Sequence, residues 1–166
     1  MNQSGQEKDT VSSPAPYDSV PTARWRSLAL AYARITLGAA FLSGIADRFG
    51  LWRGRNVGYG DFSGFVRFTA KVNSFMPSAT IPFLAWAATA AELILGILLI
   101  AGIWRRWTAI ASGALLILFG VAMAISFGLK SPLDYSVFSA SGCAFLLAAF
   151  EPSPQNREPS QPKLNP

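Results

Sequence analysis

Two charged side chains lie inside long apolar segments of this sequence, and they are the residues best placed to do chemistry. Arg34 lies in the apolar segment 28–46, and Glu92 lies in the segment 81–104. A charge near the bilayer centre costs about 2.5–3.5 kcal/mol on insertion scales, so such residues usually have a partner or a function. A small residue lies four positions from each, which predicts that both face other helices.

These two charges allow two interpretations. In the first, Arg34 pairs with Glu92 through a charge-assisted hydrogen bond, which removes two isolated ions from hydrocarbon. In the second, they serve a substrate, a proton or the head group of a quinone. Arg34 is six residues into its segment, whereas Glu92 is near the middle of its own. Pairing therefore requires the long arginine side chain to reach along the bilayer.

The composition excludes most catalytic and metal centres. The 166 residues contain no histidine and a single cysteine, Cys143, so histidine-based triads, histidine-ligated metals and CxxC redox centres are all excluded. We expect no catalytic residue, no metal site and no covalently bound cofactor. The net charge of +5 is explained by arginines near anionic lipid, so we expect no nucleic-acid partner.

Four apolar segments predict an all-α fold, an integral membrane four-helix bundle that includes 28–150. The third segment, 107–129, contains no charge and is typical of a membrane span. The fourth, 137–150, is short, and it reaches spanning length only if 133–136 continue the helix. Asp134 and Tyr135 would then lie at the membrane interface. The polar, proline-rich segments 1–27 and 151–166 are predicted to be disordered tails.

The first loop, 47–80, is predicted to contain an amphipathic helix. Apolar residues recur at helical spacing from a candidate N-cap at Asp61 until Pro77. Arg67 and Lys71 fall between them. Such a helix would lie at the membrane surface or fold over the mouth of the bundle.

The basic residues favour an orientation with both termini in the cytoplasm. With four spans, three basic groups fall on one side: Arg24 with Arg26, Arg105 with Arg106, and Arg157 with Lys163. The first loop carries a similar number of cations on the other side. We favour the first arrangement because the Arg105–Arg106 turn is too short to translocate easily.

Several short motifs occur in a recognisable order along residues 28–150. They are Ala33-Arg34, Gly38, Phe41-Leu42-Ser43-Gly44, Ala91-Glu92-Leu93, Gly96, Leu98-Leu99, Ala101-Gly102 and Asp134-Tyr135-Ser136. This order resembles the DoxX family of small bacterial membrane proteins. The resemblance implies a four-helix bundle in the bacterial inner membrane, with Arg34, Gly38, Gly44, Glu92, Gly96 and Gly102 as motif residues. The chain departs from the family in having Asp47 where many members have lysine.

Two functions follow from these observations. The resemblance implies an accessory or quinone-facing subunit of a membrane redox complex, since relatives include the small subunit of a thiosulfate:quinone oxidoreductase. Such a subunit would bind redox partner proteins and the lipid bilayer, and a second copy of itself is a further candidate partner. It would not be a catalyst on its own, and a quinone would be its cofactor. The alternative is a small-molecule or lipid transporter without redox activity, in which Arg34 and Glu92 line a polar cavity.

The orientation gives a first testable prediction. A reporter enzyme fused after Pro166 is expected to be active when it requires the cytoplasm, and inactive when it requires export. Activity of an export-dependent reporter alone would contradict the predicted orientation.

Overall fold

The computed structural model describes residues 23–52, 54 and 58–151, and helices joined by turns account for this part of the chain. Three helices are long and apolar enough to cross a membrane. These helices confirm the predicted all-α membrane bundle. The helices are α1 (Ala23–Arg48), α2 (Phe62–Val72), the short 3-10 helix η1 (Ser78–Thr80), α3 (Ile81–Ala101), α4 (Arg105–Phe127), α5 (Lys130–Asp134) and α6 (Val137–Phe150).

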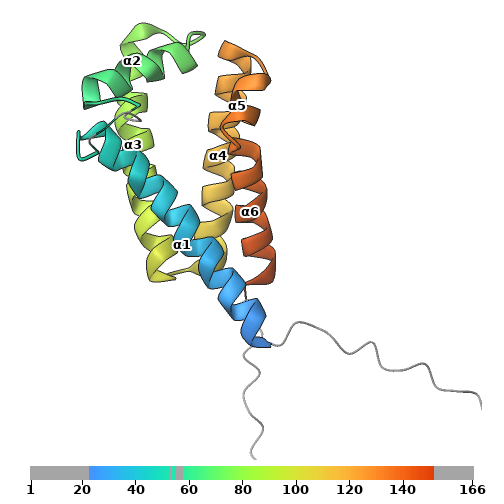
Figure 1. Cartoon of the computed structure of the whole chain (residues 1–166). Helices are drawn as coiled ribbons and strands as arrows, with labels where there is room; N and C mark the ends of the chain where they lie inside the picture. The colour runs from blue at the N-terminus through green and yellow to red at the C-terminus, as the bar shows by residue number, and fades with distance from the viewer. Residues whose placement is uncertain (1–22, 53, 55–57, 152–166) are drawn as a thin grey trace, which may run out of the picture.

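The long helices form two pairs (Figure 1). Helix α1 packs along α3, and α4 packs along α6, whereas contacts between the pairs are fewer. The pairs lie close together at the end that holds the α3–α4 turn, and they diverge toward the opposite end. There α2 lies across the bundle and contacts both α3 and α4.

The bounds of two helices differ from the sequence prediction. Helix α1 begins at Ala23, inside the predicted tail, and continues to Arg48, two residues beyond the predicted span. The fourth segment does not continue through 133–136, because Ser136 has a left-handed backbone conformation (φ 55°) that separates α5 from α6. Ser136 is therefore the N-cap residue of α6. Helix α6 has 14 residues and spans about 21 Å, less than the hydrocarbon thickness.

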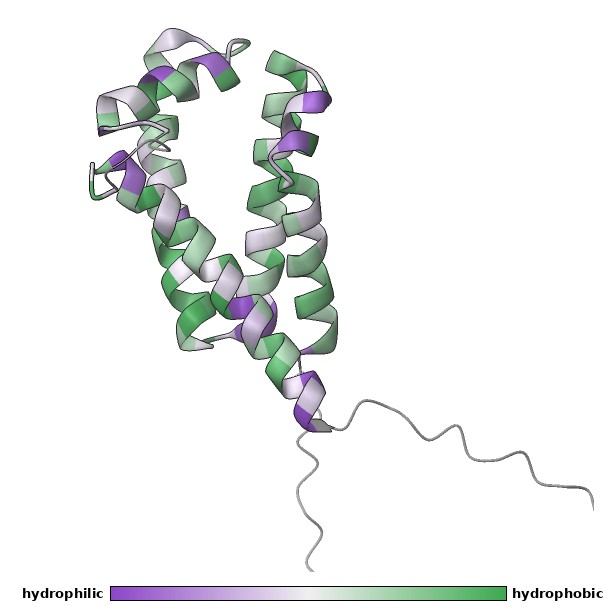
Figure 2. Cartoon of the chain, viewed as in Figure 1, coloured by the Kyte–Doolittle hydropathy of each residue, from purple (hydrophilic) through white to green (hydrophobic). Residues whose placement is uncertain are grey.

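The outer faces of the long helices are apolar, as Figure 2 shows. Only 22–28% of the residues in the most apolar windows of α1, α3 and α4 are buried within the protein. A soluble helix would have a polar face in place of these exposed side chains. The exposed apolar faces therefore contact lipid. They include Tyr32, Phe83, Ile94, Leu118, Ile125 and Leu146.

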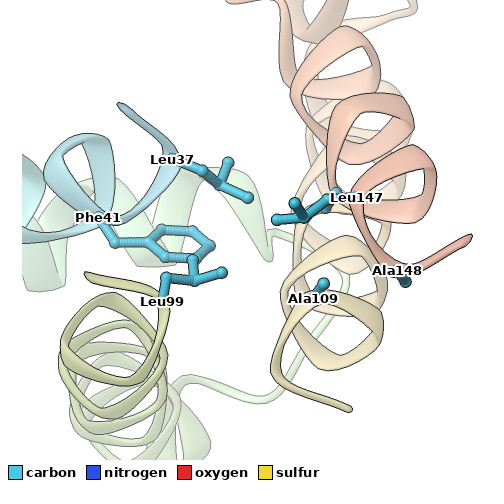
Figure 3. Packing of buried hydrophobic residues seen from close by; sticks show 7 residues of the cluster. Leu37, Phe41, Leu99, Ala109, Leu147 and Ala148 are labelled. Carbon is cyan, nitrogen blue, oxygen red and sulfur yellow. The ribbon is translucent and has the colours of Figure 1, made fainter. Parts of the chain in front are cut away.

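The apolar core lies where the two helix pairs meet (Figure 3). Leu37 and Phe41 of α1 and Leu99 of α3 face Ala109 of α4 and Leu147 of α6. Leu99 and Leu147 are 1% and 2% exposed, so this contact excludes lipid. The core holds the two pairs together at the end of the bundle that contains the α3–α4 turn.

Two glycines allow α1 and α3 to approach each other closely. A Cβ atom on Gly38 would lie 2.8 Å from the carbonyl oxygen of Gly96 and 2.7 Å from Cγ1 of Ile100. A Cβ atom on Gly96 would lie 3.0 Å from Cδ2 of Leu42. Such small-residue contacts are a main source of helix association in lipid, where the hydrophobic effect does not hold helices together.

This contact predicts that Gly38→Ala destabilises the protein by about 1–3 kcal/mol, because the added methyl group would force the two backbones apart. Gly142→Ala is the matched control: its Cβ meets nothing within 4 Å, so the helix should be unaffected or stabilised by up to about 1 kcal/mol. Unfolding in mixed detergent micelles, followed by circular dichroism, measures both. Equal stability of the two variants would contradict the close contact.

Candidate functional site

A buried ion pair joins the last residue of α1, Arg48, to Glu92 near the middle of α3, on the side of the bundle that α2 covers. Nη2 of Arg48 donates to both carboxylate oxygens of Glu92, at 2.7 and 2.8 Å. Nη1 of Arg48 donates to Oγ1 of Thr89 at 3.0 Å. Both charged residues are only 4% exposed. Each charge therefore has its counter-ion, and neither is left isolated in hydrocarbon.

Helix α2 closes this ion pair from the outside. The guanidinium carbon of Arg48 lies 3.7 Å from the centroid of the Phe65 ring, a cation–π contact that is strengthened where water is excluded. Phe65 lies on the buried face of α2 together with Thr69 and Val72. Asp61 is the N-cap of α2 and accepts a hydrogen bond from the backbone N–H of Gly64, as the sequence predicted. Hydrogen bonds from Gly64 and Ser63 lower the pKa of the Asp61 carboxyl.

The predicted pairing of Arg34 with Glu92 is wrong. Because α1 and α3 are antiparallel, Arg34 lies beside Gly102, ten residues after Glu92 and about 15 Å further along the helix direction. A Cβ atom on Gly102 would lie 2.9 Å from Nη1 of Arg34. The arginine that reaches Glu92 is Arg48, which falls within the predicted first loop, 47–80, and lies instead at the end of α1.

Arg34 instead takes part in a second ionic cluster at the other end of the bundle. Its Nη1 lies 3.5 Å from Oε1 of Glu151, and Nη1 of Arg105 lies 3.8 Å from the second oxygen. The side chain of Glu151 is 2% exposed. Glu151 was assigned to the C-terminal tail, yet it connects α1 to the start of α4. The rest of that tail, 152–166, lies outside the described residues.

The segment that precedes α2 is anchored to α1 by a carboxylate. Oδ2 of Asp47 accepts hydrogen bonds from the backbone N–H groups of Gly58 and Tyr59, at 3.0 and 3.1 Å. Tyr59 packs against Phe65 and Phe68. Burial raises the pKa of the Tyr59 phenol, and the positive charge of Arg48 acts in the opposite direction. Asp47 thus holds an aromatic wall beside α2.

The other motif residues occupy separate positions. Gly44 faces the Glu92 carboxylate, because its Cβ would lie 3.6 Å from Oε2, an ordinary contact distance. Gly102 ends α3 in a left-handed conformation (φ 67°). Asp134 pairs with Lys130 at the exposed end of α5, and Tyr135 is 72% exposed. A role for Asp134 and Tyr135 at the membrane interface stays a prediction.

The geometry predicts which residues depend on one another. Arg48→Met or Glu92→Met alone leaves a buried charge without a partner, and each should cost about 3–5 kcal/mol of unfolding free energy. The double variant Arg48→Met with Glu92→Met should recover most of this loss, whereas Arg34→Gln and Glu92→Met should be additive within about 0.5 kcal/mol. Double-mutant cycles of unfolding in micelles measure both couplings. Stronger coupling of Glu92 to Arg34 would contradict the structure.

Comparison with known proteins supports a membrane family. Residues 58–134 match the family model described as "Methylamine utilisation protein MauE", a membrane family related to DoxX. No curated protein and no solved structure matches the chain. The matched segment is slightly less than half of the sequence and contains α2, α3, α4 and α5. The chain is therefore similar to MauE over the segment that supplies Glu92 and Phe65, and the match does not extend to Arg48.

Proposed function

We propose that this protein is an accessory subunit of a membrane-bound redox system. In this role it holds partner proteins in the bilayer, and the partners carry the electrons. The sequence has no histidine and one cysteine, so its own side chains are poorly suited to electron transfer.

The main observation in favour of this proposal is that Arg48 and Glu92 are paired with each other and buried. Both carboxylate oxygens of Glu92 accept hydrogen bonds from Arg48, and Phe65 covers the guanidinium. A carboxylate that is occupied and covered in this way is not exposed to a substrate. The charges of α1 and α3 therefore favour a structural role, which suits a subunit that supports a partner.

The similarity to MauE suggests the process that such a partner serves. The description of that family names methylamine utilisation. Oxidation of an amine releases electrons, which must pass to an acceptor. We propose that this protein assists a methylamine-oxidising system at the membrane, and that it does so without a catalytic residue of its own.

A quinone does not fit the hollow found on the surface of α2. That hollow has a volume of about 240 Å³ and is lined by Arg67 and Lys71 as well as by Phe68 and Tyr59. A quinone ring needs a mainly apolar slot with a few hydrogen-bond donors, whereas two cations in an open hollow favour an anion. We therefore assign no electron-transfer step to a quinone at this position.

A transporter is the alternative function. It would need the intramembrane charges to line a polar path, and Arg34 and Glu92 lie in different clusters, each with another partner. The paired charges favour the accessory role. We further propose that the protein resides in a bacterial inner membrane with both termini in the cytoplasm, since α1 and α4 begin, and α6 ends, at the same end of the bundle. The first turns of α1 and α4 contain Arg24, Arg26, Arg105 and Arg106, which the positive-inside rule places in the cytoplasm.

The test is isolation of the tagged protein from membranes of its native host in a mild detergent. A partner that contains a redox cofactor should co-purify, and visible absorption together with mass spectrometry identifies both. Deletion of the gene should slow growth on methylamine and leave growth on other carbon and nitrogen sources unchanged. The wild-type gene should restore growth.

Two results would contradict this proposal. The first is unchanged growth on methylamine together with the absence of a cofactor-containing partner. The second is a defect in uptake or efflux of a small molecule with normal methylamine oxidation, which would support the transporter. A deletion strain that carries the Gly142→Ala gene is the control, because this substitution meets no neighbouring atom.

A further inference from the structure

A hollow on one side of α2 is lined by two cations, Arg67 and Lys71, that form no salt bridge with any described residue. Four of its lining residues, Gly64, Arg67, Phe68 and Lys71, recur at the spacing of one helix face. Gly58 and Tyr59 form the opposite wall. The volume of about 240 Å³ is well above the roughly 10–15 Å³ that one water molecule needs. The hollow thus has room for a small polar group.

The walls of this hollow are held in place by specific contacts. Asp47 of α1 accepts hydrogen bonds from the N–H groups of Gly58 and Tyr59 and so fixes the first wall. Gly64 allows that wall to approach α2, because a Cβ atom on Gly64 would lie 2.2 Å from the carbonyl oxygen of Tyr59. No other residue type fits there without movement of the backbone. The hollow is therefore a product of the fold and not a gap between loose side chains.

The two cations are free to bind an anion. Among the described residues, neither Arg67 nor Lys71 forms an ion pair. Nη1 of Arg67 donates to Oγ of Ser63 at 2.9 Å, which orients the guanidinium and leaves its other nitrogens unused. The carboxylate of Asp61 accepts from Ser63 and Gly64 at the start of the helix, and the charge of Arg67 adds to the lowering of its pKa although the two side chains form no ion pair. A planar guanidinium beside an ammonium is a typical arrangement for binding a phosphate group.

The position of α2 identifies the source of that phosphate. The helix lies across the end of the membrane bundle with Phe65 and Val72 buried against it, so its polar side lies at the level of lipid head groups. The segments that flank α2 in the sequence carry the exposed aromatic residues Trp52 and Phe75, a residue type that is enriched at membrane interfaces. A phosphate at this level belongs most readily to a lipid. An anionic lipid is favoured over a zwitterionic one because the hollow carries two positive charges and its lining contains no carboxylate.

We propose that this hollow binds the phosphate of an anionic phospholipid head group between Arg67 and Lys71. The site is separate from the Arg48–Glu92 pair and does not depend on the redox role. This site would account for the two cations on the outer side of α2, which the packing of its apolar face does not explain.

The test is lipid retention by the full-length protein in detergent, measured by native mass spectrometry with phosphatidylglycerol and phosphatidylcholine as probes. The wild-type protein should retain phosphatidylglycerol in preference to phosphatidylcholine. Since an exposed ion pair contributes up to about 1 kcal/mol, a factor of about five, Arg67→Gln with Lys71→Gln should weaken retention by up to about 30-fold, and each single substitution by up to about fivefold. Both residues are exposed, so the fold should persist, and circular dichroism checks this.

The matched control is Arg24→Gln with Arg106→Gln, which removes two exposed arginines from the opposite end of the bundle. This variant should retain phosphatidylglycerol as the wild type does. Equal losses in both double variants would show a general charge effect and would overturn the site, as would unchanged retention after the Arg67 and Lys71 substitutions. Displacement of the lipid by millimolar inorganic phosphate would assign the hollow to free phosphate and overturn the lipid assignment.

Discussion

The fold depends on the ion pair between Arg48 and Glu92, which lets a charge stay inside a bilayer. Glu92 lies near the middle of α3, where an unpaired carboxylate would strongly oppose insertion. Arg48 neutralises it and also donates to Thr89, and the ring of Phe65 then covers the arginine. Three helices therefore depend on one interaction: α1 and α3 supply the charges, and α2 excludes water and lipid from them. Close approach of α1 and α3 at Gly38 and Gly96 brings the two backbones near enough for this contact.

The pattern of apolar residues was sufficient to predict the membrane helices and the amphipathic helix in the first loop. The long apolar segments have no alternative in lipid, where every backbone group must be paired within its helix. Helix α2 was predictable because Asp61 supplies a strong N-cap before an apolar repeat. The partners of the charges were not predicted, because they depend on the register between antiparallel helices. A signal for Arg48 was present: Leu37, Phe41 and Arg48 continue one face of α1 at spacings that fit a helix, and this face includes Arg34.

Two further features could not come from the pattern alone. Glu151 follows directly after an apolar segment, and its burial depends on Arg34 and Arg105, which lie far away in the sequence. The hollow beside α2 depends on the hydrogen bonds of Asp47 and on the short distance at Gly64, which are matters of three-dimensional packing. The sequence did indicate that Asp47 departs from the lysine of DoxX proteins. The structure gives this aspartate a task that lysine could not perform, because a lysine has no acceptor for two backbone N–H groups.

The short length of α6 has a consequence for the surrounding membrane. Helix α4 has 23 residues, whereas its partner α6 has 14, because the left-handed backbone at Ser136 separates it from α5. A helix that is shorter than the hydrocarbon thickness, such as α6, is accommodated by local thinning of the bilayer. The helices of the α1–α3 pair are long enough for a bilayer of ordinary thickness. The protein therefore has one side that suits a thinner membrane and one side that does not. Hydrophobic mismatch on the α6 side favours neighbouring proteins with similarly short helices. Such a protein would then pack against α6 and not against the α1–α3 pair.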